Sequence, residues 1–257
     1  MSNKEWPASD YAIGSFIQAT VADTFLPLLD IKPDDAVLDI GCGNGSFSLK
    51  IIEKVPQGSF LGVDASENML TLARETAKAC QNADWQQADV LTLPFEGAFD
   101  YIVSFWCLQW AVDIKQAFVN ITRALKQGGR FFTLFPTGDD PFMWTFNHVR
   151  DSGQFASLRA FKPPVDYSRL HQGIETLNVL PLKTVDIQRV DEALTLPSLD
   201  TFRKFVNGIA FFHGQLELEE IKRINEAMVQ AYAEKVKEHY QGNCLFKFSV
   251  FVVTGEK

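Results

Sequence analysis

The stretch VLDIGCGNGSF, residues 37–47, decides the fold class of this chain. It joins a short apolar run that ends in Asp39 to three glycines at alternate positions, Gly41, Gly43 and Gly45. A strand that ends in a glycine turn and leads into a helix presents free backbone N–H groups and the positive end of a helix dipole above the edge of a sheet. The stretch therefore predicts a small-molecule site at the carboxyl end of a strand.

Segments typical of strands and helices alternate around this turn. The helix expected at about 114–126 should end near Lys126, and Gly128 and Gly129 would form its left-handed C-terminal exit. Such alternation predicts an α/β fold, a parallel sheet with helices on both faces. The expected strands are 36–40, 59–64, 84–89, 100–105 and 130–135, and the expected helices are about 10–29, 46–55, 67–80 and 114–126.

Glycine spacing separates three kinds of ligand site. A phosphate-binding P-loop requires GxxxxGK[ST], and no Lys follows these glycines at that offset. The dinucleotide fingerprint requires GxGxxG, whereas Ser46 stands at the third glycine position here. The GxGxG spacing therefore matches neither site well.

An acidic residue two positions before GxGxG resembles the first motif of the class I S-adenosylmethionine-dependent methyltransferases. Three later segments extend the resemblance through most of the first 140 residues: GVDASENML (62–70), QQADVLTLPF (86–95), and FDYIVSFWCLQWAVD (99–113) followed by ALKQGGRFF (124–132). The resemblance implies a methyltransferase with S-adenosyl-L-methionine as its cofactor. It also implies a Rossmann-like, seven-stranded, mostly parallel sheet with an antiparallel last strand and a helical cap insertion.

The same resemblance implies roles for individual residues. Asp64 would hold both ribose hydroxyls, Asp89 would lie beside the adenine amino group, and Asp39 would contact the methionine ammonium. A side chain at Gly41 or Gly43 would occupy the space of the methionyl group. The cofactor-binding residues predicted in this way are Tyr11, Gln18, Asp39, Gly41, Cys42, Gly43, Gly45, Asp64, Ala65, Met69, Asp89, Val90 and Phe105.

Three parts of the chain are expected on this basis. Residues 1–136 would form the cofactor-binding core with an N-terminal lid helix. Residues 137–182 and 198–241, rich in aromatic side chains and in helical patterns, would form the substrate cap. Residues 183–197, a strand with an irregularity, and 242–257 would be the last two strands of the core sheet.

The loop 104–113 favours a carboxylate as the methyl acceptor. Before Asp113 it contains no His, Glu or Lys, and an ionised carboxylate needs no general base. The loop and the segment 6–19 are similar to the branch that contains trans-aconitate, malonyl carrier-protein and juvenile hormone acid methyltransferases. In that branch the pair that corresponds to Gln109 and Trp110 faces the acceptor, so we expect these two residues to position it.

Composition limits the expected partners and metal content of the protein. The chain has 257 residues, 46% of them hydrophobic, and a net charge of −8, with 24 Lys and Arg residues spread along its length, so nucleic acid is not an expected partner. The four cysteines form no CxxC pair and the histidines lack metal-ligand spacing, so we expect reduced thiols and no metal. Without an apolar stretch of about 18 residues, a cytoplasmic monomer or homodimer that acts on a small molecule or acyl chain is predicted. Two alternatives stay open: a non-catalytic module that binds S-adenosylmethionine, and an NAD(P)-dependent oxidoreductase.

Overall fold

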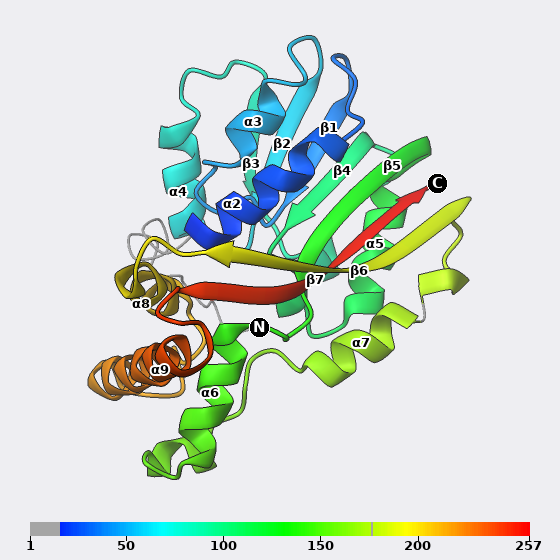
Figure 1. Ribbon diagram of the computed structural model, residues 1–257. Coiled ribbons are helices and arrows are strands. Elements are labelled where there is room, and N and C mark those ends of the chain that lie inside the picture. The colour runs from blue at the N-terminus through cyan, green and yellow to red at the C-terminus, as the bar shows by residue number, and fades with distance from the viewer. Residues whose placement is uncertain (1–15, 176) are drawn as a thin grey trace.

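The fold is built on one twisted sheet in the computed structural model, which describes residues 16–175 and 177–257 (Figure 1). Across that described part the strand order is β3-β2-β1-β4-β5-β7-β6. Neighbouring strands from β3 to β5 are parallel, and β7 is antiparallel to both β5 and β6. The predicted fold class is confirmed. The strands are β1 (Ala36–Ile40), β2 (Ser59–Asp64), β3 (Ala83–Gln87), β4 (Phe99–Phe105), β5 (Leu125–Pro136), β6 (Thr184–Thr195) and β7 (Leu245–Glu256).

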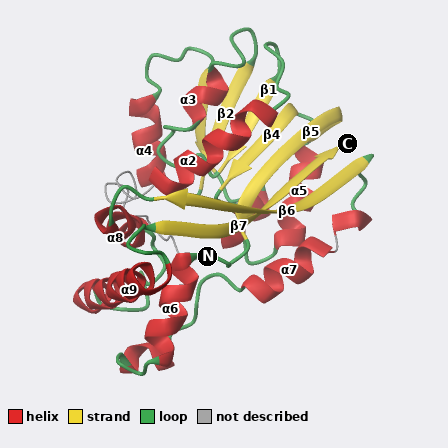
Figure 2. Cartoon of the chain, in the orientation of Figure 1, coloured by secondary structure: helices red, strands yellow, loops and turns green. Residues whose placement is uncertain are grey.

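Helices cover both faces of the sheet (Figure 2). Alternate strand residues point to opposite faces, so Val37 joins one apolar core while its neighbour Leu38 joins the other. The first core is shared by α2 (Phe16–Phe25) and α3 (Ser48–Ile52), and the second by α5 (Ile114–Ala124) and α7 (Tyr167–Glu175). The helix α4 (Glu67–Thr76) packs against β2 and β3. The carboxyl ends of the parallel strands therefore open between two layers of helices.

A separate helical group lies beyond the sheet, below β7 in Figure 1. It consists of α6 (Pro141–Asp151), α8 (Leu199–Gly208) and α9 (Leu218–His239), in which α9 packs against both other helices. Aromatic side chains pack edge to face around α6: the ring centroid of Phe146 lies 5.0 Å from that of Phe211 and 5.8 Å from that of Phe161. Such edge-to-face contacts add stabilisation to the burial of large apolar surfaces.

Two predicted details differ from the structure. The helix α5 ends at Ala124, because β5 begins at Leu125, so Gly128 with its φ of +76° lies inside the strand segment and is not the helix exit. The irregularity expected in residues 183–197 does not affect the pairing, since β6 pairs with β7 from Thr184 to Thr195 without a register shift. It appears only in the burial pattern, where Gln188 and Arg189 are two successive exposed residues.

The first predicted helix is described only from Phe16 onward, so its expected start near residue 10 lies outside the described residues. From there it places Ile17, Val21 and Phe25 in the core, as the spacing predicts. None of the helices in the described ranges combines the length and the apolar character needed to cross a bilayer.

Candidate functional site

The glycine turn after β1 is tied to the end of β2 by backbone hydrogen bonds. The amides of Gly41 and Cys42 both donate to the carbonyl oxygen of Val63, at 2.8 and 3.1 Å. The carboxylate of Asp64 then accepts from the Gly43 amide at 3.0 Å and from the Ser66 amide at 2.9 Å. The acidic end of β2 is therefore held against the turn, as the two sequence motifs require if they form one site.

Packing within the protein explains two of the three glycines. All three have positive φ angles, between +55° and +77°, which favour glycine. A Cβ at Gly41 would lie 2.3 Å from the Cβ of Cys107, and a Cβ at Gly45 would lie 3.0 Å from Cα of Ala73. The sequence-based explanation for Gly41, which assigned its missing side chain to the space of a ligand, needs correction, because Cys107 already occupies that space.

A cavity opens above the turn, and we call it the glycine-turn cavity. It holds about 790 Å³ of empty space, including the solvent at its mouth. Eight predicted residues line it, and Trp110, predicted for the acceptor, lines it too. The lining residues are Gln18, Ile40, Gly41, Gly43, Asp64, Ala65, Met69, Ala88, Asp89, Val90, Trp106, Cys107, Trp110 and Ala111.

The remaining predicted residues lie beside this cavity or outside it. Asp39, Cys42 and Phe105 line an adjoining recess on the other side of the turn, together with Gly41 and Gly43. Gly45 packs under the turn against α4 and β3, and Tyr11 lies outside the described residues. The sequence-based prediction did not include Ile40, Ala88, Trp106, Cys107 or Ala111, although each is adjacent to a motif residue at the end of a strand or in the loop that follows it.

Asp39 is the most deeply buried acid of the site, with 3% of its surface exposed. Its Oδ2 accepts a hydrogen bond from the Ser48 hydroxyl at 2.7 Å. Burial raises the pKa of Asp39 to about 7, against the lowering effect of Ser48, and the charge of Asp64 raises it further. A cation placed in the adjoining recess would favour the ionised form of Asp39.

A second cavity, which we call the aromatic chamber, adjoins the first. It holds about 650 Å³ of empty space, including the solvent at its mouth. Gln18, Trp106 and Trp110 line both cavities and so form their common wall. The other lining residues of the chamber are Ile17, Gln109, Pro136, Asp140, Phe142, Met143, Val165, Tyr167, Phe205, Ile209, Phe211, Phe246 and Phe248.

Trp106 holds the common wall in place. Its φ of +57° is unusual for a residue other than glycine, and such strained positions cluster at functional sites. Its indole N–H donates to the carbonyl oxygen of Gln18 at 2.9 Å, and its backbone amide donates to the carbonyl oxygen of Leu134 at 2.8 Å. The loop after β4 is thereby fixed to both α2 and β5.

Gln109 lies in the wall of the chamber with only 7% of its surface exposed. Its side-chain Nε2 donates to the carbonyl oxygen of Trp106 at 2.9 Å, a contact that fixes which end of the amide carries the oxygen. The opposite atom, Oε1, is buried and has no hydrogen-bond partner among the residues that the structure describes. Since buried acceptors are nearly always paired, this oxygen calls for an explanation.

Among the described residues, the ionisable groups that line the chamber are Asp140 and Tyr167. Asp140 caps the N-terminus of α6, where its Oδ1 accepts from the Met143 amide at 2.9 Å, yet its burial raises its pKa to about 6. Burial also raises the pKa of Tyr167 well above its usual value, and the charge of Asp140 adds to this effect. Tyr167 packs on Gly138, where a Cβ would lie 2.6 Å from the tyrosine ring.

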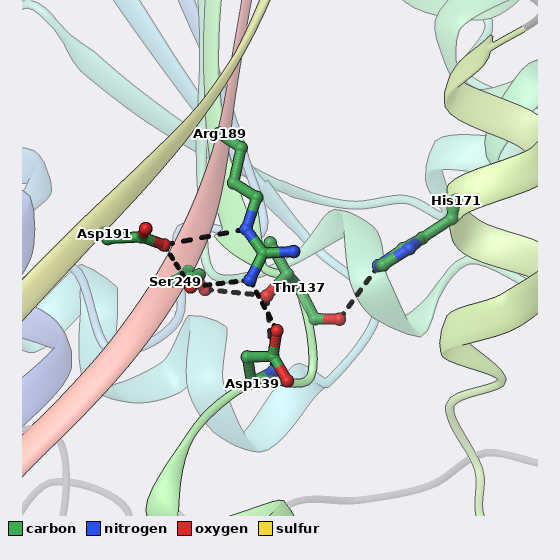
Figure 3. A network of polar contacts seen from close by, with 6 residues as sticks. All are labelled: Thr137, Asp139, His171, Arg189, Asp191 and Ser249. Atoms are coloured by element: carbon green, nitrogen blue, oxygen red, sulfur yellow. Dashed lines mark hydrogen bonds and ion pairs between the residues drawn. The ribbon is translucent and has the colours of Figure 1, made fainter.

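A polar network fixes the segment 137–140, which carries Asp140 (Figure 3). Arg189 forms an ion pair with Asp139 and donates to the Ser249 hydroxyl at 3.1 Å. The Ser249 amide donates to the carbonyl oxygen of Asp139 at 2.9 Å, and His171 Nε2 contacts the carbonyl oxygen of Thr137 at 2.9 Å. Strands β6 and β7 and helix α7 thus hold this segment at the edge of the chamber.

The segment from residue 37 to residue 129 matches the protein family described as methyltransferase domain. This segment is a methyltransferase domain. The described part of the chain has the class I methyltransferase fold. It resembles the YcgJ protein of Bacillus subtilis with a TM-score of 0.60 and 20% identity, over 91% of this chain and 97% of that one.

The alignments with curated relatives cover different shares of this chain. The demethylmenaquinone methyltransferase of Symbiobacterium thermophilum is 32% identical over 148 residues, 56% of this chain and 57% of that protein. The malonyl-[acyl-carrier protein] O-methyltransferase of Geobacter sulfurreducens is 26% identical over 242 residues, 89% of this chain and 87% of that protein. The chain spans about half the length of the curated relatives it matches first.

Proposed function

We propose that this chain is an S-adenosylmethionine-dependent methyltransferase whose cofactor occupies the glycine-turn cavity. One observation carries the proposal: within a methyltransferase domain, the turn and the Asp64 carboxylate form one wall of a cavity that shares Trp106 and Trp110 with a second, apolar chamber. Methyl transfer requires two such sites in contact, because the acceptor atom must approach the methyl carbon in line with the departing sulfur.

In this proposal the cofactor follows the order of the motifs. Asp64 binds the ribose hydroxyls, and the Gly43 and Ser66 amides that donate to its carboxylate hold it in position. Asp89 and Val90 receive the adenine at the far end of the cavity. Asp39, in the adjoining recess, stabilises the methionine ammonium. A bound cofactor would supply the positively charged sulfonium that makes the methyl group transferable.

We propose further that the aromatic chamber binds the acceptor and that the cap selects it. The segments 137–182 and 198–241 support this assignment, because they supply Phe142, Tyr167 and Phe205 to the chamber wall. Gln109 and Trp110 lie between the two sites, where they would position the reacting group.

The acceptor atom is proposed to be oxygen. The malonyl-[acyl-carrier protein] O-methyltransferase, which aligns with 89% of this chain, supports an oxygen acceptor. Carboxylate remains the more specific prediction from the sequence, whereas the demethylmenaquinone methyltransferases carry the name of another substrate class.

Two titrations and one transfer assay test the proposed function. Calorimetry with S-adenosylhomocysteine should show saturable binding, while NADH should show none; the reverse result would make the chain a dinucleotide-binding protein. Methyl-labelled S-adenosylmethionine should then pass its label to an apolar acceptor in a mixed panel. Cofactor binding without transfer to any member would favour the non-catalytic binding module.

A further inference from the structure

The aromatic chamber is poorly suited to an anion. Among the residues that the structure describes, its lining contains no Lys, Arg or His, and its ionisable groups are Asp140 and Tyr167. A carboxylate substrate would have to give up its water without a cationic partner, which is strongly unfavourable in an apolar site. It would also lie near a second carboxylate, that of Asp140.

Gln109 indicates what the chamber accepts instead. Its buried Oε1 meets no donor from residues 16–175 and 177–257, while its Nε2 donates to the carbonyl oxygen of Trp106. A substrate that donates a hydrogen bond would satisfy this oxygen, whereas an ionised carboxylate can only accept. The unpaired acceptor of Gln109 and the lack of a cation in the described lining thus both favour an uncharged substrate that donates a hydrogen bond.

We propose that the methyl acceptor is an uncharged, largely apolar molecule with a reacting hydroxyl group, which donates to Gln109 when it enters and gives its proton to Asp140 during transfer. This inference rests on the proposed methyltransferase function. Aromatic side chains such as Phe142, Phe205 and Phe248 surround the apolar body of the substrate.

The step balances in atoms and charge. The hydroxyl oxygen forms a bond to the methyl carbon as the bond from that carbon to the sulfonium sulfur breaks. The sulfur leaves as a neutral thioether, and the hydroxyl proton moves to the Asp140 carboxylate, which becomes neutral as well. One positive and one negative charge therefore disappear together, and the apolar chamber favours such neutralisation over charge separation.

Asp140 is built to act as this base. It is held as the N-cap of α6, and the network around Asp139 and Arg189 fixes the segment that carries it. The groups that face it are the carboxylate of Asp139, which raises its pKa, the phenol of Tyr167, and the Phe142 and Met143 amides, which lower it. With burial as the largest effect, its pKa of about 6 leaves it ionised but basic at neutral pH.

A binding experiment tests the preference directly. The full chain, saturated with S-adenosylhomocysteine at pH 7.5, is titrated with 4-butylphenol and with 4-butylbenzoate, which share one apolar body. At this pH the phenol is neutral and the benzoate is ionised. We expect the phenol to bind tighter by roughly tenfold or more, and the variant Gln109→Met to lose several-fold of that preference because its thioether is a weak acceptor. Equal or tighter binding of the benzoate, or no binding of the phenol, would overturn the proposal.

A transfer experiment tests Asp140. Asp140→Asn keeps a residue that caps helices well, so α6 should persist, but its amide cannot take up a proton. With 4-butylphenol as acceptor, we expect the variant to bind the phenol normally and to transfer the methyl label about a hundredfold more slowly. The matched control is Asp113→Asn, which alters the N-cap of α5 away from the chamber and should transfer at the wild-type rate.

The outcomes distinguish a failure of the hydroxyl assignment from a failure of the proposed methyltransferase function. Label transferred to the benzoate, no transfer to the bound phenol, or an Asp140→Asn rate equal to that of wild type would refute the hydroxyl assignment while leaving the methyltransferase function intact. Failure to bind S-adenosylhomocysteine at all would refute the proposed function itself. The thermal midpoints of the Asp140 and Asp113 variants would show whether either change acts through loss of folding.

Discussion

Asp39 predicts an unusual dependence of stability on pH. The folded protein raises the pKa of this carboxyl from 3.8 to about 7, chiefly because the group is buried. Between these two values the folded state holds a proton that the unfolded state has released. Stability therefore falls as the pH rises from about 4 to about 7 and then levels off, because above that range both states are ionised.

The size of the effect follows from the separation of the two values. Each pH unit between them corresponds to about 1.4 kcal/mol, so ionisation of Asp39 costs the folded state roughly 4 kcal/mol above pH 7. Asp39→Asn removes this cost, because the amide does not titrate. Ser48→Ala should act in the opposite direction, since the lost hydroxyl raises the pKa of Asp39 further.

Urea unfolding followed by tryptophan fluorescence, at steps from pH 5 to pH 8.5, measures both effects. The difference in unfolding free energy between Asp39→Asn and wild type should change by about 1.4 kcal/mol per pH unit below pH 7 and then become constant. A difference that stays the same across the whole range would refute the argument. With S-adenosylmethionine present the slope should shrink, because a bound ammonium group favours the ionised carboxylate.

The remaining predictions concern the two cavities. Asp64→Ala should weaken S-adenosylhomocysteine binding about ten- to a hundredfold by calorimetry, as expected for lost hydrogen bonds to a charged group; unchanged affinity in a folded variant would remove Asp64 from the cofactor site. Gly41→Ala should lower the thermal midpoint, because the new Cβ meets that of Cys107, and Cys107→Gly should restore part of the loss; no recovery would mean that the φ angle alone requires glycine. Trp110→Ala should reduce methyl transfer far more than cofactor affinity, and an equal loss of both would place its role in the cofactor site alone.

The sequence predicts those parts of the fold that depend on neighbours along the chain. Alternating helix and strand patterns locate the first five strands, and the spacing from Asp39 to Gly45 marks the turn between β1 and α3. The boundary at Ala124 escaped prediction because the strand begins at once, so the helix needs no glycine exit. The sequence predicts an irregularity in β6 because this exposed edge strand carries charged residues that interrupt its alternation, although its pairing is regular.

The residues of the site also differ in whether neighbours along the chain identify them. Asp64, Asp89 and Val90 stand next to motif glycines or strand ends and are recognisable from sequence, whereas the role of Cys107 beneath Gly41 depends on a contact across 66 positions of the chain. No local sequence pattern shows that Cys107 occupies the space next to Gly41. The sequence can therefore predict correctly that a position requires glycine and still not identify the group that excludes a side chain there.

The aromatic chamber is the part of the site that the sequence predicts least well. Before Asp113 the loop 104–113 contains no His, Glu or Lys, and the sequence therefore predicts a carboxylate acceptor, which needs no base. The fold brings Asp140 to the aromatic chamber from the segment that follows β5, along with Tyr167 from α7, so the base that we propose lies outside the loop. Once a carboxylate stands in the chamber and no cation lines the part of it that the structure describes, the acceptor that fits is a neutral donor. The chemistry of the acceptor is thus set by residues that only the tertiary structure brings together.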